Sequence, residues 1–406
     1  MKILMISDVY FPRVNGVSTS ILTFTRSFIE QGHEVTLIAP DYPDVGEHEF
    51  EILRIPSCQV PLDPEDRFMH RRHIRRLLPE LRRRDFNILH IHTPFVAHYA
   101  GTWLGKRLGV PVVVSYHTFF EAYLEKYIPW MPHSWLRALA RSFSRNQCNA
   151  VDGVVSPSKQ MLARLREYGV TRQAHVIPTG LDLEQFRGRA SNTFRQRHDI
   201  PGDAFLCLYL GRVAHEKNID FLIEMFEFLK HDIDRARLVI AGEGPALPGL
   251  KKQVQRLGMD DSVHFIGYLK PIEAVVDCYR ASDVFVFASE TETQGLVLLE
   301  AMACGTPVVS CACLGSEDVL KDGEGCLISS LDWQLFADRV IALANDDERR
   351  RQLSTAGLEY VRDWSTEAKS AEMLDFYCRV IDRRASLGQH EETDSYDSLD
   401  QQEMQP

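Results

Sequence analysis

The 406-residue sequence contains no run of about 20 apolar residues, the length that a helix needs to cross a bilayer, so a membrane-spanning segment is not expected. Its nine cysteines are scattered without Cys-x-x-Cys spacing, which argues against a disulfide framework and against a zinc site. The Gly-x-Gly-x-x-Gly spacing that binds dinucleotides is missing after the first expected strand, which argues against a dehydrogenase. The first eight residues indicate a strand rather than a secretory signal. We therefore expect a globular, cytoplasmic protein in a reducing compartment.

The net charge of −11 is unevenly distributed along the chain. Residues 1–180 carry a net charge of +5, and the remainder carries −16. The acidic part would repel nucleic acid, so nucleic acid is not expected as a partner. The basic part is suited to an anionic surface.

Short apolar runs alternate with helix-length segments along the chain, which is typical of parallel sheets wound by βα units. The first expected series of strands is 3–6, 34–38, 88–91, 112–115, 153–155 and 175–177. The second series is 205–210, 237–241, 263–266, 283–287, 307–310 and 325–328. We therefore predict an α/β protein with two Rossmann-like domains that face each other across a cleft.

Turn residues at 178–182 separate the two series, so we place the hinge there. The expected N-terminal domain covers residues 1–180 and the C-terminal domain covers residues 181–365. Residues 366–385 are typical of a helix. Residues 386–406 hold six acids, no Lys or Arg and almost no large apolar residues, so we expect a disordered acidic tail.

Ser289–Val309 is the most informative stretch, because it predicts a strand end, a glycine at a helix start, a short apolar helix and the next strand. The amides of Gly295 and Leu296 at the helix N-terminus are suited to a diphosphate. Glu292 and Glu300 are acids, which repel phosphate and are better suited to accepting hydrogen bonds from sugar hydroxyls. Glu300 lies about 7.5 Å along the helix axis from Gly295 at 1.5 Å per residue. The pattern therefore favours a nucleotide-sugar site.

This stretch resembles the signature of retaining nucleotide-sugar glycosyltransferases with two Rossmann-like domains. The resemblance rests on Glu292, seven intervening residues and Glu300, followed by Ala-Met-Ala-Cys-Gly-Thr-Pro-Val-Val. It implies that Glu292 contacts the transferred sugar and Glu300 the ribose. Most members have an aromatic residue before the glycine, where this chain has Gln294. The Thr-Glu-Thr-Gln-Gly version resembles a subgroup of diacylglycerol glucosyltransferases.

Two further loops follow first strands of the expected domains. Arg212 and Lys217, after residues 205–210, supply the positive charge that a departing diphosphate requires, and the resemblance gives them that role. Gly16 is expected to begin the helix after residues 3–6. The resemblance implies that the backbone of Gly16 and Val17 approaches the donor phosphates. A purely structural turn is the alternative for this loop.

His117 follows the strand 112–115 and is therefore expected at the carboxyl end of the sheet, facing the cleft. With the family resemblance, we predict that it contacts the donor sugar. His90 and His92 alternate around the end of another strand, so only one of them is expected to point to the cleft. The resemblance also implies a nucleobase site at two loops after strands, at Glu243, Gly244, Tyr268 and Leu269. It further implies that the last helix returns to the first domain.

No metal or other cofactor is expected. The only Asp-x-Asp sequence, Asp232-Ile233-Asp234, precedes a strand and so lies at the end of the sheet opposite the predicted site. Arg212, Lys217 and a helix N-terminus already oppose the phosphates, which makes Mg²⁺ redundant.

Two segments of the basic half indicate a membrane-surface acceptor. Arg67–Arg84 and Phe119–Phe143 combine cations with apolar and aromatic residues, the pattern of an interfacial helix attracted to anionic lipid. An ordinary helix with a solvated arginine face is the alternative for either segment.

We therefore expect a metal-independent, retaining glycosyltransferase that is peripherally associated with the inner face of the cell membrane. The expected reaction moves glucose from UDP-glucose to the hydroxyl of diacylglycerol. The alternatives are a GDP-mannose-dependent enzyme that acts on an inositol lipid and a hexosyltransferase with a soluble sugar acceptor. A non-catalytic nucleotide-binding module is the alternative from another class.

Overall fold

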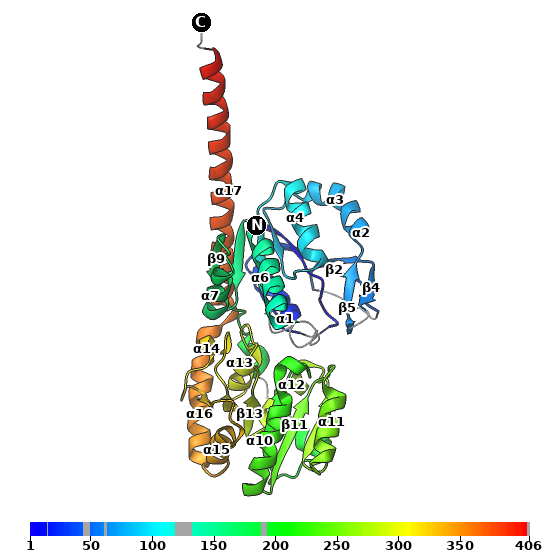
Figure 1. Ribbon diagram of the computed structural model, residues 1–406, viewed down its shortest axis with the longest axis vertical. Coiled ribbons are helices and arrows are strands. Elements are labelled where there is room, and N and C mark those ends of the chain that lie inside the picture. Colours follow the sequence, from blue (N-terminus) through cyan, green and yellow to red (C-terminus); the bar gives the residue numbers. More distant parts are fainter. Residues whose placement is uncertain (14, 44–48, 61–62, 118–131, 188–192, 404–406) are drawn as a thin grey trace.

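The computed structural model describes the chain apart from residues 14, 44–48, 61–62, 118–131, 188–192 and 404–406. The side chains of residues 60, 63–66, 133, 187 and 387–403 also lie outside the description. The described residues form two α/β lobes along the long axis of the molecule, each built around one parallel sheet (Figure 1). The predicted fold class is therefore confirmed.

The N-terminal lobe contains a seven-stranded parallel sheet in the order β3-β2-β1-β6-β7-β8-β9. Its strands are β1 Lys2–Ile6, β2 Glu34–Pro40, β3 Glu51–Ile55, β6 Ile88–Ile91, β7 Val112–Ser115, β8 Gly153–Ser156 and β9 Gln173–Val176. Its helices are α1 Gly16–Glu30, α2 Arg71–Arg76, α3 Leu78–Arg84, α4 Val96–Leu108, α6 His133–Asn149 and α7 Lys159–Glu167. An antiparallel pair, β4 Ser57–Val60 and β5 Asp63–Met69, joins β3 to α2. The sequence pattern did not predict β3 or this pair. In β3, charged residues at positions 51 and 54 interrupt the apolar run, and only Ile55 is fully buried.

The C-terminal lobe contains a six-stranded sheet in the order β12-β11-β10-β13-β14-β15. Its strands are β10 Phe205–Leu210, β11 Ala236–Ala241, β12 Val263–Gly267, β13 Val284–Phe287, β14 Val308–Ser310 and β15 Cys326–Ile328. The helices before β13 are α8 Leu183–Arg187, α9 Phe194–Arg197, the 3₁₀ turn η1 His215–Lys217, α10 Ile219–Asp232, α11 Leu247–Arg256 and α12 Ile272–Ala281. Those after β13 are α13 Leu296–Ala303, α14 Ser316–Val319, α15 Trp333–Ala344, α16 Asp347–Tyr360 and the 3₁₀ turn η2 Val361–Trp364.

Buried apolar strands explain why both sheets are covered on two faces. In β1, Leu4 and Ile6 pack into the core that α2, α3, α4 and α7 cover, whereas Ile3 and Met5 pack into the core beneath α1. Alternate side chains of a strand point to opposite faces, so an all-apolar strand requires helices on both sides. The carboxyl ends of such strands carry the loops that bind ligands.

Two chain segments cross between the lobes side by side. The amide of Leu181 donates a hydrogen bond to the Trp364 carbonyl at 2.7 Å, and Leu181 forms a parallel bridge with Ser365. A Cβ added to Gly180 would lie 2.5 Å from the Thr366 Cα, so only glycine permits this approach without a shift of the backbone. The lobes are thus joined by a closely packed double crossing rather than by a single strand of chain.

The last helix, α17 Thr366–Glu403, packs on the N-terminal lobe and then extends away from it (Figure 1). Met373, Phe376 and Tyr377 are buried in the same core as α1. Arg384 forms an ion pair with Asp152 at 3.0 Å. The backbone stays helical through Glu403, so the structure differs from the disordered segment expected from residue 386. The segment 386–403 lacks proline, the residue that would terminate a helix.

Candidate functional site

A cavity of about 420 Å³ lies between the two lobes, at the carboxyl ends of both sheets. The start of α1 and the loop after β7 line it from the N-terminal lobe. The loops after β10 and β12 and the segment 291–300 line it from the C-terminal lobe. The predicted site residues among its lining are Gly16, Val17, His117, Arg212, Lys217, Tyr268, Leu269, Glu292, Gly295, Leu296 and Glu300. Residues predicted from separate motifs are therefore brought to one cavity.

Helix α13 begins at Leu296 with Gly295 as its N-cap in the left-handed region, at φ +86°. An added Cβ would also lie 2.9 Å from Leu298 Cδ1, so two independent constraints favour glycine here. The first turn of α13 holds no acid, and the unpaired amides at its start therefore keep their positive potential. This helix end is a suitable site for an anion.

Helix α1 begins at Gly16 as predicted, and its start also lines the cavity. The Asn15 side chain caps it by accepting a hydrogen bond from the Ser18 amide at 2.8 Å. An added Cβ on Gly16 would meet nothing within 4 Å, so packing alone does not require glycine. Two helix N-termini, one from each lobe, thus lie along the walls of one cavity.

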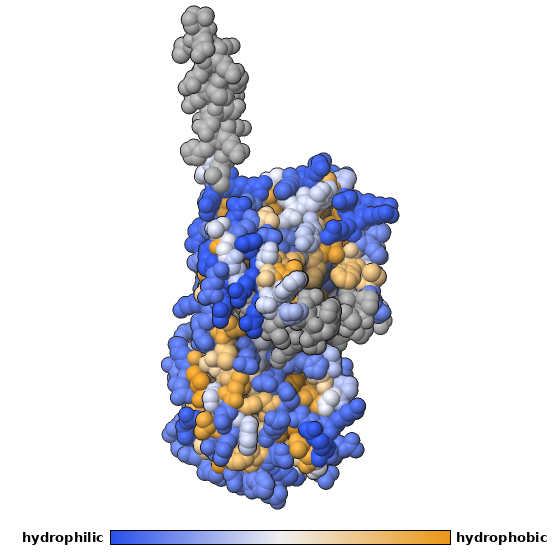
Figure 2. All heavy atoms as spheres, in the orientation of Figure 1, coloured by the Kyte–Doolittle hydropathy of each residue, from blue (hydrophilic) through white to orange (hydrophobic). Residues whose placement is uncertain are grey.

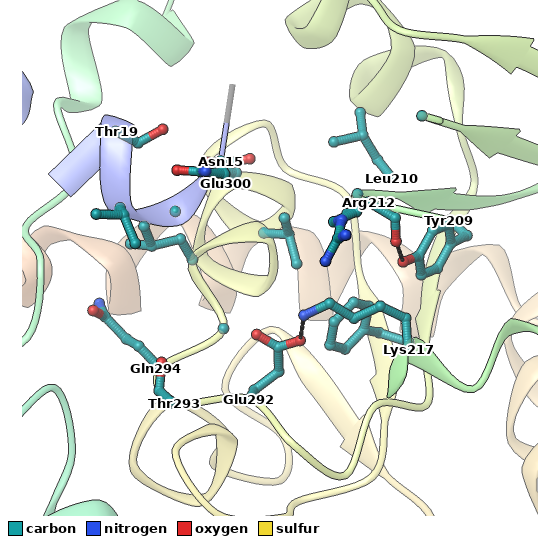
Figure 3. Close-up of a pocket in the computed structure, with 18 of the residues that line it drawn as sticks. Asn15, Thr19, Tyr209, Leu210, Arg212, Lys217, Glu292, Thr293, Gln294 and Glu300 are labelled. Atoms are coloured by element: carbon teal, nitrogen blue, oxygen red, sulfur yellow. Dashed lines mark hydrogen bonds and ion pairs between the residues drawn. The ribbon is translucent and has the colours of Figure 1, made fainter. Parts of the chain in front are cut away.

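The cationic side chains of the cavity are paired with acids. Lys217 forms a close ion pair with Glu292, as Figure 3 shows, and Arg212 lies 3.4 Å from Glu216. The Lys217 and Glu292 side chains are 22% and 14% exposed, so solvent and small ligands reach both. A bound ligand could compete with the Lys217–Glu292 ion pair, since a hydroxyl group can donate to Glu292 and an anion can bind Lys217.

Glu300 is a half-buried residue of α13 that lines the cavity and accepts a hydrogen bond from the Tyr279 hydroxyl at 2.9 Å. Burial raises the pKa of its carboxyl, and the Tyr279 hydrogen bond partly opposes that rise. One hydrogen bond leaves further acceptor positions on the two carboxyl oxygens. A ribose with two adjacent hydroxyls matches this requirement.

His117 is half-buried at the cavity wall, and desolvation of its ring lowers its pKa to about 4, so the ring is neutral near pH 7. Its Nε2 atom has no hydrogen-bond partner among the described residues. The ring stacks on His92 with centroids 5.8 Å apart. His92 is not among the residues that line the cavity, whereas His117 is.

The predicted nucleobase loops divide into two pairs. Tyr268 and Leu269 line the cavity, whereas Glu243 and Gly244 do not. The Glu243 carbonyl accepts a hydrogen bond from the Val213 amide at 2.8 Å, and a Cβ on Gly244 would lie 2.4 Å from the Val213 carbonyl oxygen. Glu243 and Gly244 therefore hold the loop that carries Arg212.

The sequence patterns assigned no role in the site to three lining residues that join the lobes: Thr179, Thr293 and Gln294. Gln294 accepts a hydrogen bond from the Thr179 amide and donates one to the Thr179 carbonyl, both at 2.8 Å. Thr293 donates to the His117 carbonyl at 3.1 Å. The sequence held one indication of this contact: Gln294 stands where most members of the family that the chain resembles have an aromatic residue.

No group of three or more His, Cys, Asp or Glu side chains suited to a metal ion occurs among the described residues. Asp232 ends α10 and Asp234 precedes β11, so both lie at the amino end of the sheet, opposite the cavity. The described groups that give the cavity positive potential are the N-termini of α1 and α13 and the side chains of Arg212 and Lys217.

The first predicted membrane segment folds differently from an interfacial helix. Ile74 of α2 and Leu81 of α3 are fully buried in the core, so the apolar side of Arg67–Arg84 faces the domain. Its arginines remain on the surface, which is hydrophilic over α2 and α3 in Figure 2. Several guanidinium groups lie over aromatic rings: Arg71 over Tyr99, and Arg75 and Arg107 over Trp103.

The second predicted membrane segment is described only from residue 132 onward. On α6, Trp135 is 72% exposed and Leu139 is 59% exposed, one helical turn apart, whereas Leu136 is buried. Residues 119–131 of the segment lie outside the described residues. In the part of the chain that the structure describes, every helix is too short or too polar to cross a bilayer.

Comparisons with known proteins agree with this arrangement. Residues 14–185 match the model of Glycosyltransferase Family 4, and residues 190–360 match that of Glycosyl transferases group 1. The chain is 35% identical over 318 residues to an alpha-monoglucosyldiacylglycerol synthase of Streptococcus pneumoniae, covering 76% of this chain and 71% of that protein. It is 27% identical to a GDP-mannose-dependent alpha-mannosyltransferase of Corynebacterium glutamicum, covering 94% of this chain and 89% of that protein.

A solved structure has the same fold. Anabaena HepE in complex with UDP superposes with a TM-score of 0.74 at 15% identity, covering 93% of this chain and 100% of that chain. At this identity the similarity concerns the fold alone.

Proposed function

Since this chain belongs to the glycosyltransferases with two Rossmann-like domains, we propose that it transfers glucose from UDP-glucose to the hydroxyl of diacylglycerol. The transferred glucose and the diacylglycerol acceptor are suggested by the Streptococcus pneumoniae relative, whose name describes a glucosyldiacylglycerol synthase.

The observation that carries the proposal is the composition of the interlobe cavity. Two helix N-termini and the cations Arg212 and Lys217 face the same space as the acids Glu292 and Glu300. Anions bind at helix N-termini and beside cations, whereas carboxylates bind hydroxyl groups. A nucleoside diphosphate sugar combines these chemistries: a ribose for Glu300, a diphosphate for the middle, and a hexose for Glu292 and His117.

The reaction breaks the bond between the sugar C1 and the diphosphate oxygen and forms a bond between C1 and the acceptor oxygen. We propose attack from the same face of the sugar, with the acceptor proton passing to the departing phosphate oxygen, so that configuration is retained. Arg212, Lys217 and the α13 amides stabilise the charge that develops on the diphosphate. No metal is required for that stabilisation, because these groups supply the positive charge.

We propose that the N-terminal lobe brings the cavity to the inner face of an anionic membrane. Trp135 and Leu139 form an exposed apolar pair on α6, and the arginines of α2 lie on the surface of the same lobe. Aromatic and basic side chains favour the interface of anionic lipid. The free state of all nine cysteines agrees with a reducing compartment.

A second candidate is the transfer of mannose from GDP-mannose to an inositol lipid. It is favoured by the similarity to the Corynebacterium glutamicum mannosyltransferase over nearly the whole chain. The two candidates differ in nucleobase, hexose and acceptor, so one experiment separates them.

The experiment is a donor-by-acceptor screen with the purified full chain, read by the mass of the product. UDP-glucose and GDP-mannose are each offered with vesicles containing diacylglycerol, with vesicles containing phosphatidylinositol, and with soluble sugars. We expect a mass gain of one hexose on diacylglycerol with UDP-glucose alone. Product only with GDP-mannose, or only on a soluble sugar, would contradict the proposal.

A further inference from the structure

Two adjacent side chains bind the loop that carries Glu292 to the N-terminal lobe. Gln294 makes a two-way amide contact with the Thr179 backbone at the hinge, accepting from its N–H and donating to its C=O. Thr293 donates to the His117 carbonyl at the cavity wall. Figure 3 shows Thr293 and Gln294 on the same loop as Glu292.

The Gln294 contact continues into helix α1. Thr179 is 4% exposed and Gln294 is 5% exposed. The Thr179 hydroxyl donates to the Ser20 hydroxyl at 2.8 Å, and Ser20 lies about one turn from the start of α1 at Gly16. A buried hydrogen-bond chain therefore joins the mouth of α13, through the hinge, to the first turn of α1.

Gly315 holds the same loop from the other side. Its amide donates to the Glu292 carbonyl at 2.9 Å, and an added Cβ would lie 2.1 Å from the Thr293 carbonyl carbon. The backbone of the loop is thus enclosed between Gly315 on one side and Thr179 on the other. A movement that separates Thr179 from this loop breaks the Gln294 contacts, because the close packing of Gly315 holds the loop on the C-terminal lobe.

We propose that Gln294 is a positioning residue for sugar transfer, whose amide holds the two lobes so that the N-termini of α1 and α13 face one diphosphate. The proposal rests on the proposed function. Gln294 is not a catalytic residue, since its side-chain oxygen and nitrogen are both bonded to the hinge backbone. Its effect is on the geometry of Glu292 and of the helix ends.

The first test compares Gln294→Leu with Gln160→Leu. Gln160 on α7 also joins the lobes, by a 3.0 Å hydrogen bond to Glu317 of α14, but it does not line the cavity. We expect Gln294→Leu to lower kcat about tenfold and to raise the Kd for UDP by a smaller factor, since Arg212, Lys217 and the α13 N-terminus stay in place and only the contribution of α1 to the diphosphate is weakened. Gln160→Leu should keep kcat and Kd near wild type.

The second test uses Gln294→Glu and pH. As a carboxylate, the new side chain accepts from the Thr179 amide but cannot donate to the Thr179 carbonyl. As a neutral acid it does both, so the activity of the variant relative to wild type should rise about tenfold from pH 8 to pH 5.5. The nearby titratable groups, His117 and the Lys217–Glu292 pair, are common to both proteins. Gln294→Leu should show no such rise.

A third measurement needs no transfer activity. Small-angle scattering of the folded chain should give a larger radius of gyration for Gln294→Leu than for wild type and for Gln160→Leu. The proposal would be overturned if both Gln294 variants kept the kcat of wild type. It would also be overturned if the activity of Gln294→Glu relative to wild type did not change with pH. A wild-type protein that is inactive with every donor would instead overturn the proposed function, while scattering still tests the role of Gln294.

Discussion

At the residue scale, the ion pair between Lys217 and Glu292 makes the clearest prediction. Lys217→Ala should remove the charge that stabilises the leaving diphosphate, and Glu292→Ala should remove a contact to the sugar. We expect each variant to lose about a thousandfold in transfer rate, the upper range for one lost charge-stabilising group. The measurement is initial rate with UDP-glucose and diacylglycerol vesicles, beside a circular dichroism spectrum that should stay unchanged.

A matched control for this prediction is Lys230→Ala. Lys230 also pairs with an acid, Asp234 at 3.6 Å, but the pair lies on the surface of the same lobe. Removing an exposed pair changes stability by at most about 1 kcal/mol, and transfer should be unaffected. Near wild-type rates for both Lys217→Ala and Glu292→Ala would remove these residues from the site.

At the element scale, a row of buried histidines connects the carboxyl ends of β6 and β7 with α17. His90 bonds to the Ser115 hydroxyl at 2.8 Å and to the Tyr377 hydroxyl, and its ring packs against that of His92 with centroids 4.0 Å apart and planes tilted by 33°. Burial lowers the pKa of His90 to about 3 and that of His92 well below its ordinary value. Folding therefore requires these rings to be neutral.

This burial predicts acid sensitivity. Below about pH 6.5 the unfolded chain binds protons that the folded chain excludes, so the free energy of unfolding falls as pH falls, by about 1.4 kcal/mol per pH unit for each such histidine. His92→Phe removes one of these groups without removing a hydrogen bond seen among the described residues. Its melting temperature should fall less than that of wild type between pH 7 and pH 5.

Asp8 contributes with the opposite sign, because burial raises its pKa to about 6 and it binds a proton more readily when folded. It is present in both proteins, so its contribution cancels in the comparison. Parallel melting curves for wild type and His92→Phe over this pH range would contradict the prediction.

At the scale of the whole molecule, the distribution of exposed apolar residues predicts which lobe meets a membrane. Trp135→Ser combined with Leu139→Ser should weaken binding to anionic vesicles about tenfold or more, since two apolar contacts with the interface are lost. The measurement is co-sedimentation with vesicles that contain phosphatidylglycerol. The matched control is Trp333→Ser with Leu335→Ser, which are 46% and 55% exposed on α15 of the other lobe.

The control pair should leave vesicle binding unchanged. Equal loss in both double variants, or loss only in the control, would show that the N-terminal lobe is not the membrane-facing one. Binding that survives both but falls at high salt would assign the contact to the arginines of α2 and α3 alone.

Local sequence patterns were sufficient to predict most strands and helices and the motif that carries the site. A short continuous apolar run such as 205–210 predicts a buried strand from adjacent residues alone. The glycine at position 295, directly before a short apolar helix, is also a local signal. The two sheets, the start of α1 at Gly16 and the position of the α13 mouth could therefore be predicted. Strand β3 could not, because Glu51 and Arg54 interrupt its apolar residues and leave neither a continuous apolar run nor a regular alternation.

Contacts between residues far apart in the chain could not be predicted and are set by the packing of the folded lobes. Gln294 and Thr179 are 115 positions apart, and their hydrogen bonds depend on how two separately folded lobes dock. Likewise, the apolar side of Arg67–Arg84 is identical in sequence whether it faces lipid or a domain core, and the packing of Ile74 and Leu81 selected the core. Periodicity reports that a face is apolar, but the partner that covers it is set by long-range packing, which leaves no local signature.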